Sequence, residues 1–374
     1  MRGQIRKRGK SYSVVVFAGK DAKGKKKYIW ETFRTSDQAQ KRLTELLHQI
    51  DTGTLARPKG TLGEFTEQWL EYSKSNLRIT TYMGYKNIYS SGISPKLGNI
   101  LLKDLRPSHI QEYMVAKLST GASNTTVRHH LTFLHAVLER EVKLQLLTRN
   151  PVDAISMPKI IKKEMKILDK QQAALILTEL EKSPYYPIYA LALCTGMRQS
   201  ELLALKWKDL DLLMAELSVN KGSHRLPGGE FVITPPKTRK SKRRIPLSPD
   251  VCIMLRHHLD DQINQCAKTD IKFTDDRLVF CKYKGEPINP NTVSQYWTRL
   301  LKRLNCPHVR FHDLRHTAAS WMIMKGVPYK TVSEILGHES IATTLDIYGH
   351  LLPGMQQEAV KVFDNILDHR IARE

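Results

Sequence analysis

The chain has 374 residues, which is more than one ordinary hydrophobic core needs and predicts two or three domains. Its 59 Lys and Arg against 37 Asp and Glu leave a net charge of +22, which favours a polyanionic partner, with nucleic acid ahead of an acidic membrane. A hydrophobic content of 41% excludes a disordered chain, and the lack of any apolar run of about 18 residues excludes a membrane span.

Residues 1–57 predict a small basic module of strands and one helix. The segments YSVVVFA (residues 12–18) and YIWETF (28–33) are rich in β-branched and aromatic residues, and residues 2–6 are a candidate third strand. Apolar residues at the helical period predict a helix over residues 36–50. With 14 Lys and Arg against 5 Asp and Glu, the module predicts a sheet face that enters a DNA major groove, with nonspecific DNA affinity as the alternative.

Residues 61–155 predict a helical domain between two linkers. The linkers are TGTLARPK (residues 52–59) and PVDAISMPKIIKKE (151–164), which contain glycine, proline and lysine without periodicity. Four helices are expected, beginning near Thr61, Thr80, Arg106 and Ser123. Lys86 and Arg128 are candidate phosphate contacts, although each alone is more simply interpreted as a solvated helix residue.

A third domain begins with a helix for which Asp169 is the candidate N-cap. The apolar helix YALALCT (residues 189–195) ends at Gly196, and Arg198 follows near the N-terminus of another helix, a region that favours phosphate. Glu201 lies three residues further on and can orient the Arg198 guanidinium.

Three short strands and one amphipathic helix are expected next. The strands are residues 217–219, 231–234 and 244–247, and the basic helix is Asn289–Leu304, capped near Asn291. A basic run, PPKTRKSKRRIP, lies between the second and third strands and begins its charges at Lys237. General DNA affinity is our interpretation of its members Arg239, Lys240, Lys242 and Arg243.

Residues 308–350 contain the residue types that bind and attack a phosphate. His312 and Arg315 are three residues apart, so a helix places them on one face. His338 follows the helix-stopping residue Gly337, where a turn can aim it at that pair. Arginine binds phosphate oxygens, histidine donates or moves protons, and a tyrosine can attack phosphorus.

Two further helices are predicted in this segment, over Tyr329–Leu336 and Ile341–Tyr348, with Ser340 as the N-cap of the second. Tyr348 ends the second helix, where a packed aromatic is the alternative interpretation. We interpret three other histidines as surface or capping residues, namely His308, His316 and His350.

The segments TGMRQSELLAL, HDLRHT, LGHES and LDIYGH resemble, in this order, the active-site motifs of the tyrosine recombinases. The closest type is the integrases of temperate bacteriophages and integrative conjugative elements. The resemblance implies a multidomain, mainly α fold with small β elements. It comprises a three-stranded sheet and helix at 1–57 that binds arm-type DNA, a helical core-binding domain at 61–155, and a mixed, mostly helical catalytic domain at 165–374 with a C-terminal tail helix.

The residues that match the catalytic motifs are Arg198, Lys237, His312, Arg315, His338 and Tyr348. The resemblance implies that the two arginines bind the phosphate and that Lys237 protonates the departing 5′ oxygen, with general DNA affinity as the alternative for this lysine. His312 would act as general base or phosphate donor, and His338 would donate to a non-bridging oxygen. Tyr348 would attack a phosphodiester and form a 3′-phosphotyrosyl link.

The partners that the resemblance implies are double-stranded DNA at core-type and arm-type sites, further copies of the chain in a synaptic tetramer, and an excisionase-type accessory protein. We expect no cofactor and no metal, because the sequence contains neither G-x-x-x-x-G-K-[ST] nor an acidic cluster suited to two metal ions. Five cysteines without C-x-x-C fit a reducing bacterial cytoplasm.

Two alternatives to an integrating and excising recombinase remain at this stage. One is a DNA-binding regulator of the same fold without strand exchange, and the other is a relaxing topoisomerase with the same chemistry. The complete set of catalytic residues argues against the regulator. A tail helix over residues 354–371 would dock on a neighbouring subunit, or else pack on its own domain.

Overall fold

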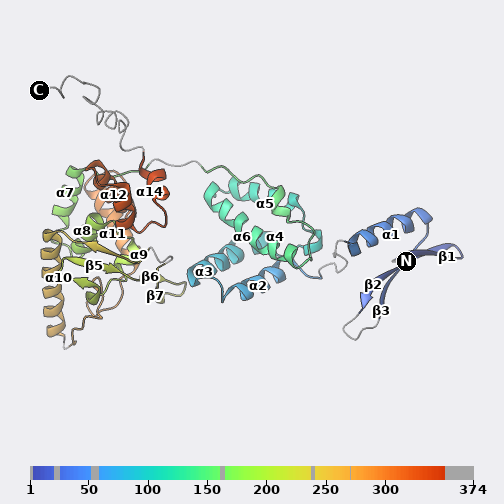
Figure 1. Cartoon of the computed structure of the whole chain (residues 1–374), viewed down its shortest axis with the longest axis horizontal. Helices are drawn as coiled ribbons and strands as arrows, with labels where there is room; N and C mark the ends of the chain where they lie inside the picture. The colour runs from blue at the N-terminus through green and yellow to red at the C-terminus, as the bar shows by residue number, and fades with distance from the viewer. Residues whose placement is uncertain are drawn as a thin grey trace, which may run out of the picture. The chain divides into compact units, whose positions relative to one another are not determined.

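The computed structural model describes residues 3–20, 26–51, 59–160, 165–236, 241–269 and 271–349. The chain divides into two compact units, Met1–Lys162 and Lys163–Glu374, whose elements are labelled in Figure 1. Within the described ranges, no helix is long and apolar enough to cross a membrane. Several sequence-based expectations lie wholly or partly outside these ranges. They are the first linker at residues 52–59, the end of the second linker at 161–164, the basic residues Lys237, Arg239 and Lys240, His350 and the tail helix at residues 354–371.

The unit Met1–Lys162 begins with the expected three-stranded sheet, which is followed by one helix. Strands β1 (Gly3–Arg8), β2 (Ser11–Lys20) and β3 (Lys26–Phe33) pair antiparallel in the order β1-β2-β3, and α1 (Ser36–Asp51) follows. Val14, Val16 and side chains of α1 form a small core, because alternate residues of β2 face the helix. Trp30, 54% exposed, and Arg6 project from the opposite face, and the Arg6 guanidinium lies 5.8 Å from the Trp30 ring centroid.

A helical bundle with its own core forms the remainder of this unit. Its helices are α2 (Leu62–Ser73), α3 (Ile79–Ile88), the π-helix Tyr89–Ile93, α4 (Ser94–Leu97), a 3-10 turn (Leu102–Asp104), α5 (Pro107–Ser119), α6 (Asn124–Lys143) and a 3-10 turn (Pro151–Ala154). Thr61 begins α2 with a capping box, since its hydroxyl accepts from Glu64 N and its own N–H donates to the Glu64 carboxylate. The four predicted helices are confirmed.

The start of the second predicted linker is wrong. Val152 is 1% exposed and Ile155 is 8% exposed, and both pack in the core of the bundle. The two prolines and the missing periodicity suggested a linker, but a 3-10 turn needs no helical periodicity to bury its apolar residues. The π-helix and α4 were not predicted either.

Unit Lys163–Glu374 is a mixed, mostly helical fold. Its helices are α7 (Lys170–Leu180), α8 (Tyr186–Thr195), α9 (Gln199–Leu202), a 3-10 turn (Trp207–Asp209), α10 (Pro249–Lys268), α11 (Pro290–Arg303), α12 (Asp313–Met324), α13 (Tyr329–Leu336) and α14 (Ile341–Tyr348). One sheet has the order β4-β5-β8, and a hairpin pairs β6 with β7. The strands are β4 (Leu210–Asp211), β5 (Glu216–Val219), β6 (Gly222–Arg225), β7 (Phe231–Thr234) and β8 (Arg243–Pro246).

Several sequence-based boundaries in this unit can be scored. Asp169 caps α7 and Ser340 caps α14 as expected, and the bounds of α13 and α14 match the predicted ones. The cap of α11 is Asn289 and not Asn291, because the Asn289 side chain accepts from Asn291 N. Helix α10 and strand β6 were not predicted.

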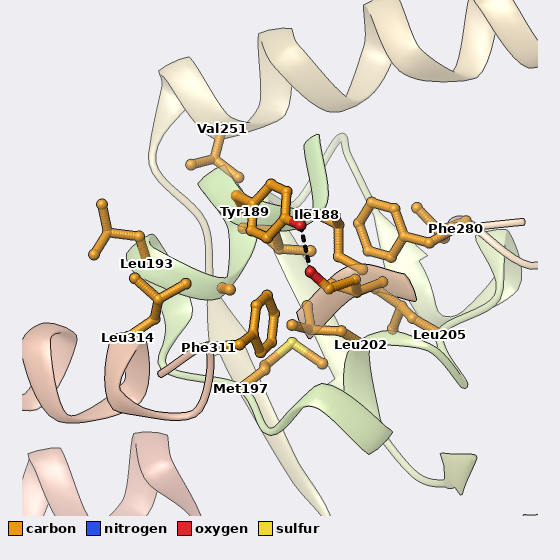
Figure 2. Close-up of a cluster of buried hydrophobic side chains, with 14 of the residues drawn as sticks. Ile188, Tyr189, Leu193, Met197, Leu202, Leu205, Val251, Phe280, Phe311 and Leu314 are labelled. Carbon is orange, nitrogen blue, oxygen red and sulfur yellow. Dashed lines mark hydrogen bonds between the residues drawn. The ribbon is translucent and has the colours of Figure 1, made fainter. Parts of the chain in front are cut away.

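The core of this unit surrounds α8, which is buried along almost its whole length. Figure 2 shows Ile188 and Tyr189 of α8 amid Val251 of α10 and Phe311 and Leu314 near the start of α12. The Tyr189 hydroxyl donates to Val293 O at 2.7 Å, which satisfies the one polar atom of this ring. A fixed α8 gives a fixed C-terminus, and the candidate site begins there.

Candidate active site

The end of α8 brings Arg198 out of the core. Gly196 ends the helix with φ of 64°, a left-handed conformation that favours glycine, and a Cβ there would lie 2.7 Å from Leu336 Cδ2. Arg198 is the N-cap of α9, and its Nη1 donates to Glu201 Oε1 at 2.8 Å. The expectation that Glu201 orients this guanidinium is confirmed, and the Arg198 side chain retains 35% exposure.

Arg315 of α12 reaches the same place from the interior. It is 3% exposed, and its guanidinium donates to Gly196 O at 2.8 Å and to Leu336 O at 2.7 Å. Burial, followed by the charge of Arg198, lowers its pKa to about 9, which leaves it charged at neutral pH. Arg315 therefore holds the ends of α8 and α13 together with its two outer nitrogens.

The C-terminus of α13 accepts hydrogen bonds from three arginines. Ile335 O accepts from Arg243 Nε at 2.5 Å, Leu336 O accepts from Arg315, and Gly337 O accepts from Arg198 Nη2 at 3.5 Å. These carbonyls have no helical partner and form the negative end of the helix dipole, which stabilises nearby cations. The three arginine side chains are thus gathered around one helix end.

The burial of Arg243 shows that our interpretation of this residue as a source of general DNA affinity was wrong. Its side chain is only 5% exposed, and its Nη2 donates to Glu201 Oε2 at 2.8 Å. Burial alone would raise the pKa of Glu201, but the hydrogen bonds and charge of Arg243, with the charge of Arg198, lower it to about 2. The sequence did hold a signal, because Arg243 shares a strand face with Ile245, which is 2% exposed.

His338 is positioned by both the helix before it and the helix after it. Gly337 ends α13 with φ of 68°, and the backbone N–H of His338 donates to Ser333 O at 3.0 Å. His338 Nδ1 lies 2.8 Å from Oγ1 of Thr344, a fully buried residue of α14. When this hydroxyl donates to Nδ1, the imidazole carries its proton on Nε2, which is then a donor for a ligand.

Tyr348 is packed as well as polar. It is 0% exposed within a cluster that includes Ile323 and Leu336, so the packed-aromatic interpretation describes its ring correctly. Its hydroxyl lies 2.7 Å from His316 Nδ1. Burial raises the pKa of Tyr348 to about 12, and the charge of Arg315 opposes that change, so the phenol is neutral at pH 7.

His316 was therefore wrongly interpreted as a surface or capping residue. It is partly buried, and its ring contacts Tyr348. The spacing of four residues from His312 was the available signal, because i and i+4 share a helix face. The centroids of the His312 and His316 rings lie 5.7 Å apart at 82°.

Five of the six predicted catalytic residues gather in one place, and Lys237 lies outside the described residues. Desolvation lowers the pKa values of both His312 and His338 to about 4, and the charges of Arg315 and Arg198 lower them as well. Two guanidiniums, neutral imidazoles and a phenol together can bind a phosphate and attack it.

Comparison with known proteins identifies the family of the chain. The phage integrase family matches residues 166–354, and the phage integrase N-terminal SAM-like domain matches residues 61–118. The ICEBs1 integrase of Bacillus subtilis (strain 168) is 30% identical over 288 residues, 76% of this chain and 78% of that protein. A XerC-like tyrosine recombinase of Caldanaerobacter subterraneus subsp. tengcongensis is 29% identical over 96% of this chain and 97% of its own length.

Two solved structures share the fold. The Tn1549 transposon integrase in complex with a circular intermediate DNA has a TM-score of 0.71 and 21% identity, and the match covers 82% of this chain and 100% of that one. A lambda integrase dimer bound to a COC′ core site has a TM-score of 0.59 and 18% identity, with coverage of 93% and 94%. The chain belongs to the phage integrase family and is a site-specific tyrosine recombinase of the kind that mobile elements carry.

Proposed function

We propose that the chain integrates and excises a mobile element or prophage by cutting and rejoining DNA through a 3′-phosphotyrosyl link to Tyr348. Tyr348 Oη attacks the phosphorus, the bond from phosphorus to the 5′ oxygen breaks, and a 5′ hydroxyl of a partner strand later reverses the reaction. The observation that carries the proposal is the Tyr348 hydroxyl, hydrogen-bonded to His316 beside the arginines at the end of α13.

The two arginines bind the scissile phosphate in this proposal. The Arg198 side chain is 35% exposed, whereas Arg315 is 3% exposed and offers a charge fixed by two carbonyls. His338 donates from Nε2 to a non-bridging oxygen, because Thr344 occupies Nδ1. These groups stabilise the charge that develops on the pentacoordinate phosphorus, where preorganised donors have their largest effect.

The proton of the phenol passes to His316 in our assignment. Its Nδ1 is the ring nitrogen that contacts the Tyr348 hydroxyl, whereas His312 lies one helical turn earlier and is the better placed to donate to the phosphate. Lys237 gives its proton to the departing 5′ oxygen, so one proton is taken up as another is released. The bond energy stays in the covalent link, and the reaction needs neither ATP nor a metal.

A nicked suicide substrate tests the nucleophile. Tyr348→Phe keeps the ring and its packing but removes the attacking oxygen, so DNA binding survives and covalent product on a denaturing gel disappears. The wild-type chain forms the product equally in the presence of a chelator. Covalent product from Tyr348→Phe, or loss of product with a chelator, contradicts the mechanism. A topoisomerase without synapsis would form the link but exchange no strands between two DNA molecules.

The remaining parts of the chain have separate roles in this proposal. The sheet module at residues 1–57 binds arm-type sites and the bundle at residues 61–155 binds core-type sites in cytoplasmic, double-stranded DNA. Four copies assemble on the DNA, with the tail after Pro353 docked on a neighbour, and an excisionase-type protein sets the direction. A structure of a lambda integrase tetramer bound to a Holliday junction, 19% identical, supports the assembly.

Truncation of the chain after Pro353 tests the role of the tail. It should weaken assembly but spare DNA binding, and normal recombination by the truncated chain would contradict this role.

A further inference from the structure

Arg243 joins three elements that the recombination site needs in fixed positions. It extends from β8, bonds both oxygens of Glu201 in α9 at 3.2 and 2.8 Å, and donates from Nε to Ile335 O in α13. A Cβ on Gly337 would lie 2.9 Å from Arg243 Nη1, so this guanidinium packs directly against the turn that precedes His338. The Arg243 side chain therefore connects Glu201, which bonds Arg198, to the backbone turn that precedes His338.

The geometry excludes a direct phosphate contact as the role of Arg243. Its side chain is 5% exposed, and each of its three nitrogens already has an acceptor within the protein. The next residue on the strand shows the contrast. Arg244 has a side chain that is 78% exposed, and its nearest carboxylate oxygen, on Glu216, lies 3.7 Å away. Two adjacent arginines of one basic run thus occupy opposite faces of β8 and have different environments.

The Glu201 carboxylate bonds two cations, Arg198 and Arg243, and so couples the environment of one arginine to the presence of the other. The carboxylate, 7% exposed, accepts from the Arg198 guanidinium through Oε1 and from the Arg198 backbone N–H through Oε2. It also accepts from Arg243 through both oxygens. The three side chains together carry a net charge of +1, so a phosphate that approaches Arg198 still meets a positive group. Without Arg243 the remaining pair would be neutral, and the buried carboxylate would compete with the phosphate for Arg198.

We propose that Arg243 is a positioning residue of the recombination site: it retains the Glu201 carboxylate so that Arg198 stays available to the scissile phosphate, and it fixes the end of α13 from which His338 projects. This inference rests on the phosphate-binding roles proposed above for Arg198 and His338. A planar fork is required for it, because one guanidinium bonds a carboxylate with two nitrogens and a carbonyl with the third.

The test measures single-turnover cleavage of a nicked suicide substrate at saturating DNA, alongside the DNA dissociation constant and thermal unfolding of the full chain. Arg243→Gln should cleave ~100-fold more slowly, because a small displacement of catalytic groups is costly. Its DNA affinity should stay within about threefold, because no phosphate contact is lost. Arg243→Lys should not restore the rate, since an ammonium lacks the fork. Arg244→Gln is the matched control, with the same charge removed and an unchanged cleavage rate.

The double variant Arg243→Gln/Glu201→Gln separates positioning from folding. It removes the buried cation and the buried anion together, so it should fold even where Arg243→Gln does not. It should cleave about tenfold faster than Arg243→Gln, because the competing carboxylate is gone, yet about tenfold more slowly than wild type, because the fork is gone. Wild-type cleavage by the double variant overturns the positioning role. A folded Arg243→Gln that cleaves no more slowly than the double variant overturns the competition with phosphate.

Failure of this inference is distinct from failure of the proposed function. Covalent product from Tyr348→Phe would remove the nucleophile assignment whatever Arg243 does. An inactive Tyr348→Phe together with a folded Arg243→Gln of wild-type rate would remove only the role of Arg243. If Arg243→Gln lost DNA affinity but cleaved saturating DNA at the wild-type rate, Arg243 would be a DNA contact, and the inference would also be overturned.

Discussion

Arginine side chains have opposite environments on the sheet β1-β2-β3 and in the unit Lys163–Glu374. Arg6 projects from the exposed face of β1 toward the Trp30 ring, whereas Arg315 is 3% exposed and bonded to two carbonyls. An exposed cation attracts DNA at any nearby phosphate, and salt screens that attraction. A buried cation must have its partners in place before a ligand arrives, since leaving it unpaired costs about 3–5 kcal/mol. The exposed arginine of the sheet is therefore suited to attracting DNA, and the buried arginine of the unit Lys163–Glu374 is suited to holding its partners in fixed positions.

The largest effect is expected for Arg315→Lys. A lysine keeps the charge but cannot bond Gly196 O and Leu336 O in the same arrangement, so cleavage should fall ~10³-fold and the melting temperature should drop. Arg6→Lys is the matched change on the sheet and should leave both quantities unchanged. Suicide-substrate cleavage and calorimetry measure the two outcomes. A folded Arg315→Lys variant of normal rate would remove the distinction between the two regions.

A substitution of Lys237 tests whether this lysine donates a proton in catalysis or only adds general DNA affinity. Lys237→Ala should slow cleavage by ~10²–10⁴-fold if this lysine protonates the leaving 5′ oxygen. A substrate with sulfur in place of that oxygen should restore the rate, because a thiolate leaves without a proton. Loss of DNA affinity, with no rescue by sulfur, would instead place Lys237 with the general DNA contacts.

Removal of residues 1–57 should have a smaller and more selective effect. The truncated chain should still cleave core-type sites but lose its protection of separate arm-type sites in a footprint. Within the full chain, Arg6→Ala should reduce the slope of log affinity against log salt by ~0.9 at arm-type DNA, as expected for one lost phosphate contact. Unchanged protection of the arm-type sites by the truncated chain would refute the assignment of the module.

The comparison of the two arginine classes also shows how far the sequence could be interpreted. Local signals sufficed where they were strong: Gly337 ends α13, and Ser340 begins α14, at the expected positions. Arg243 and His316 were misjudged because their roles depend on partners far away in the chain, Glu201 and Tyr348. Composition describes Arg243 and Arg244 alike, whereas the alternation of β8, one face of which is buried, separates them.

The smallest expected effect is a change of stability with pH. Burial and the charges of Arg315 and Arg198 lower the pKa of His338 from 6.5 to about 4. Between those pH values the unfolded chain binds more protons than the folded one, so the free energy of unfolding falls as the pH falls. His338→Gln should flatten this dependence in thermal unfolding measured from pH 7 to pH 4. A slope identical to that of wild type would show that His338 does not titrate in this way.

Thr344 and Tyr348 are one helical turn apart on α14, and each bonds a histidine of the site. A rigid shift of this short helix that separates the phenol from His316 also withdraws the hydroxyl from His338. The proposed nucleophile and the proposed donor to the phosphate oxygen therefore move together. In an assembly where only some copies cut at one time, a single displacement of eight residues would switch both functions within a subunit.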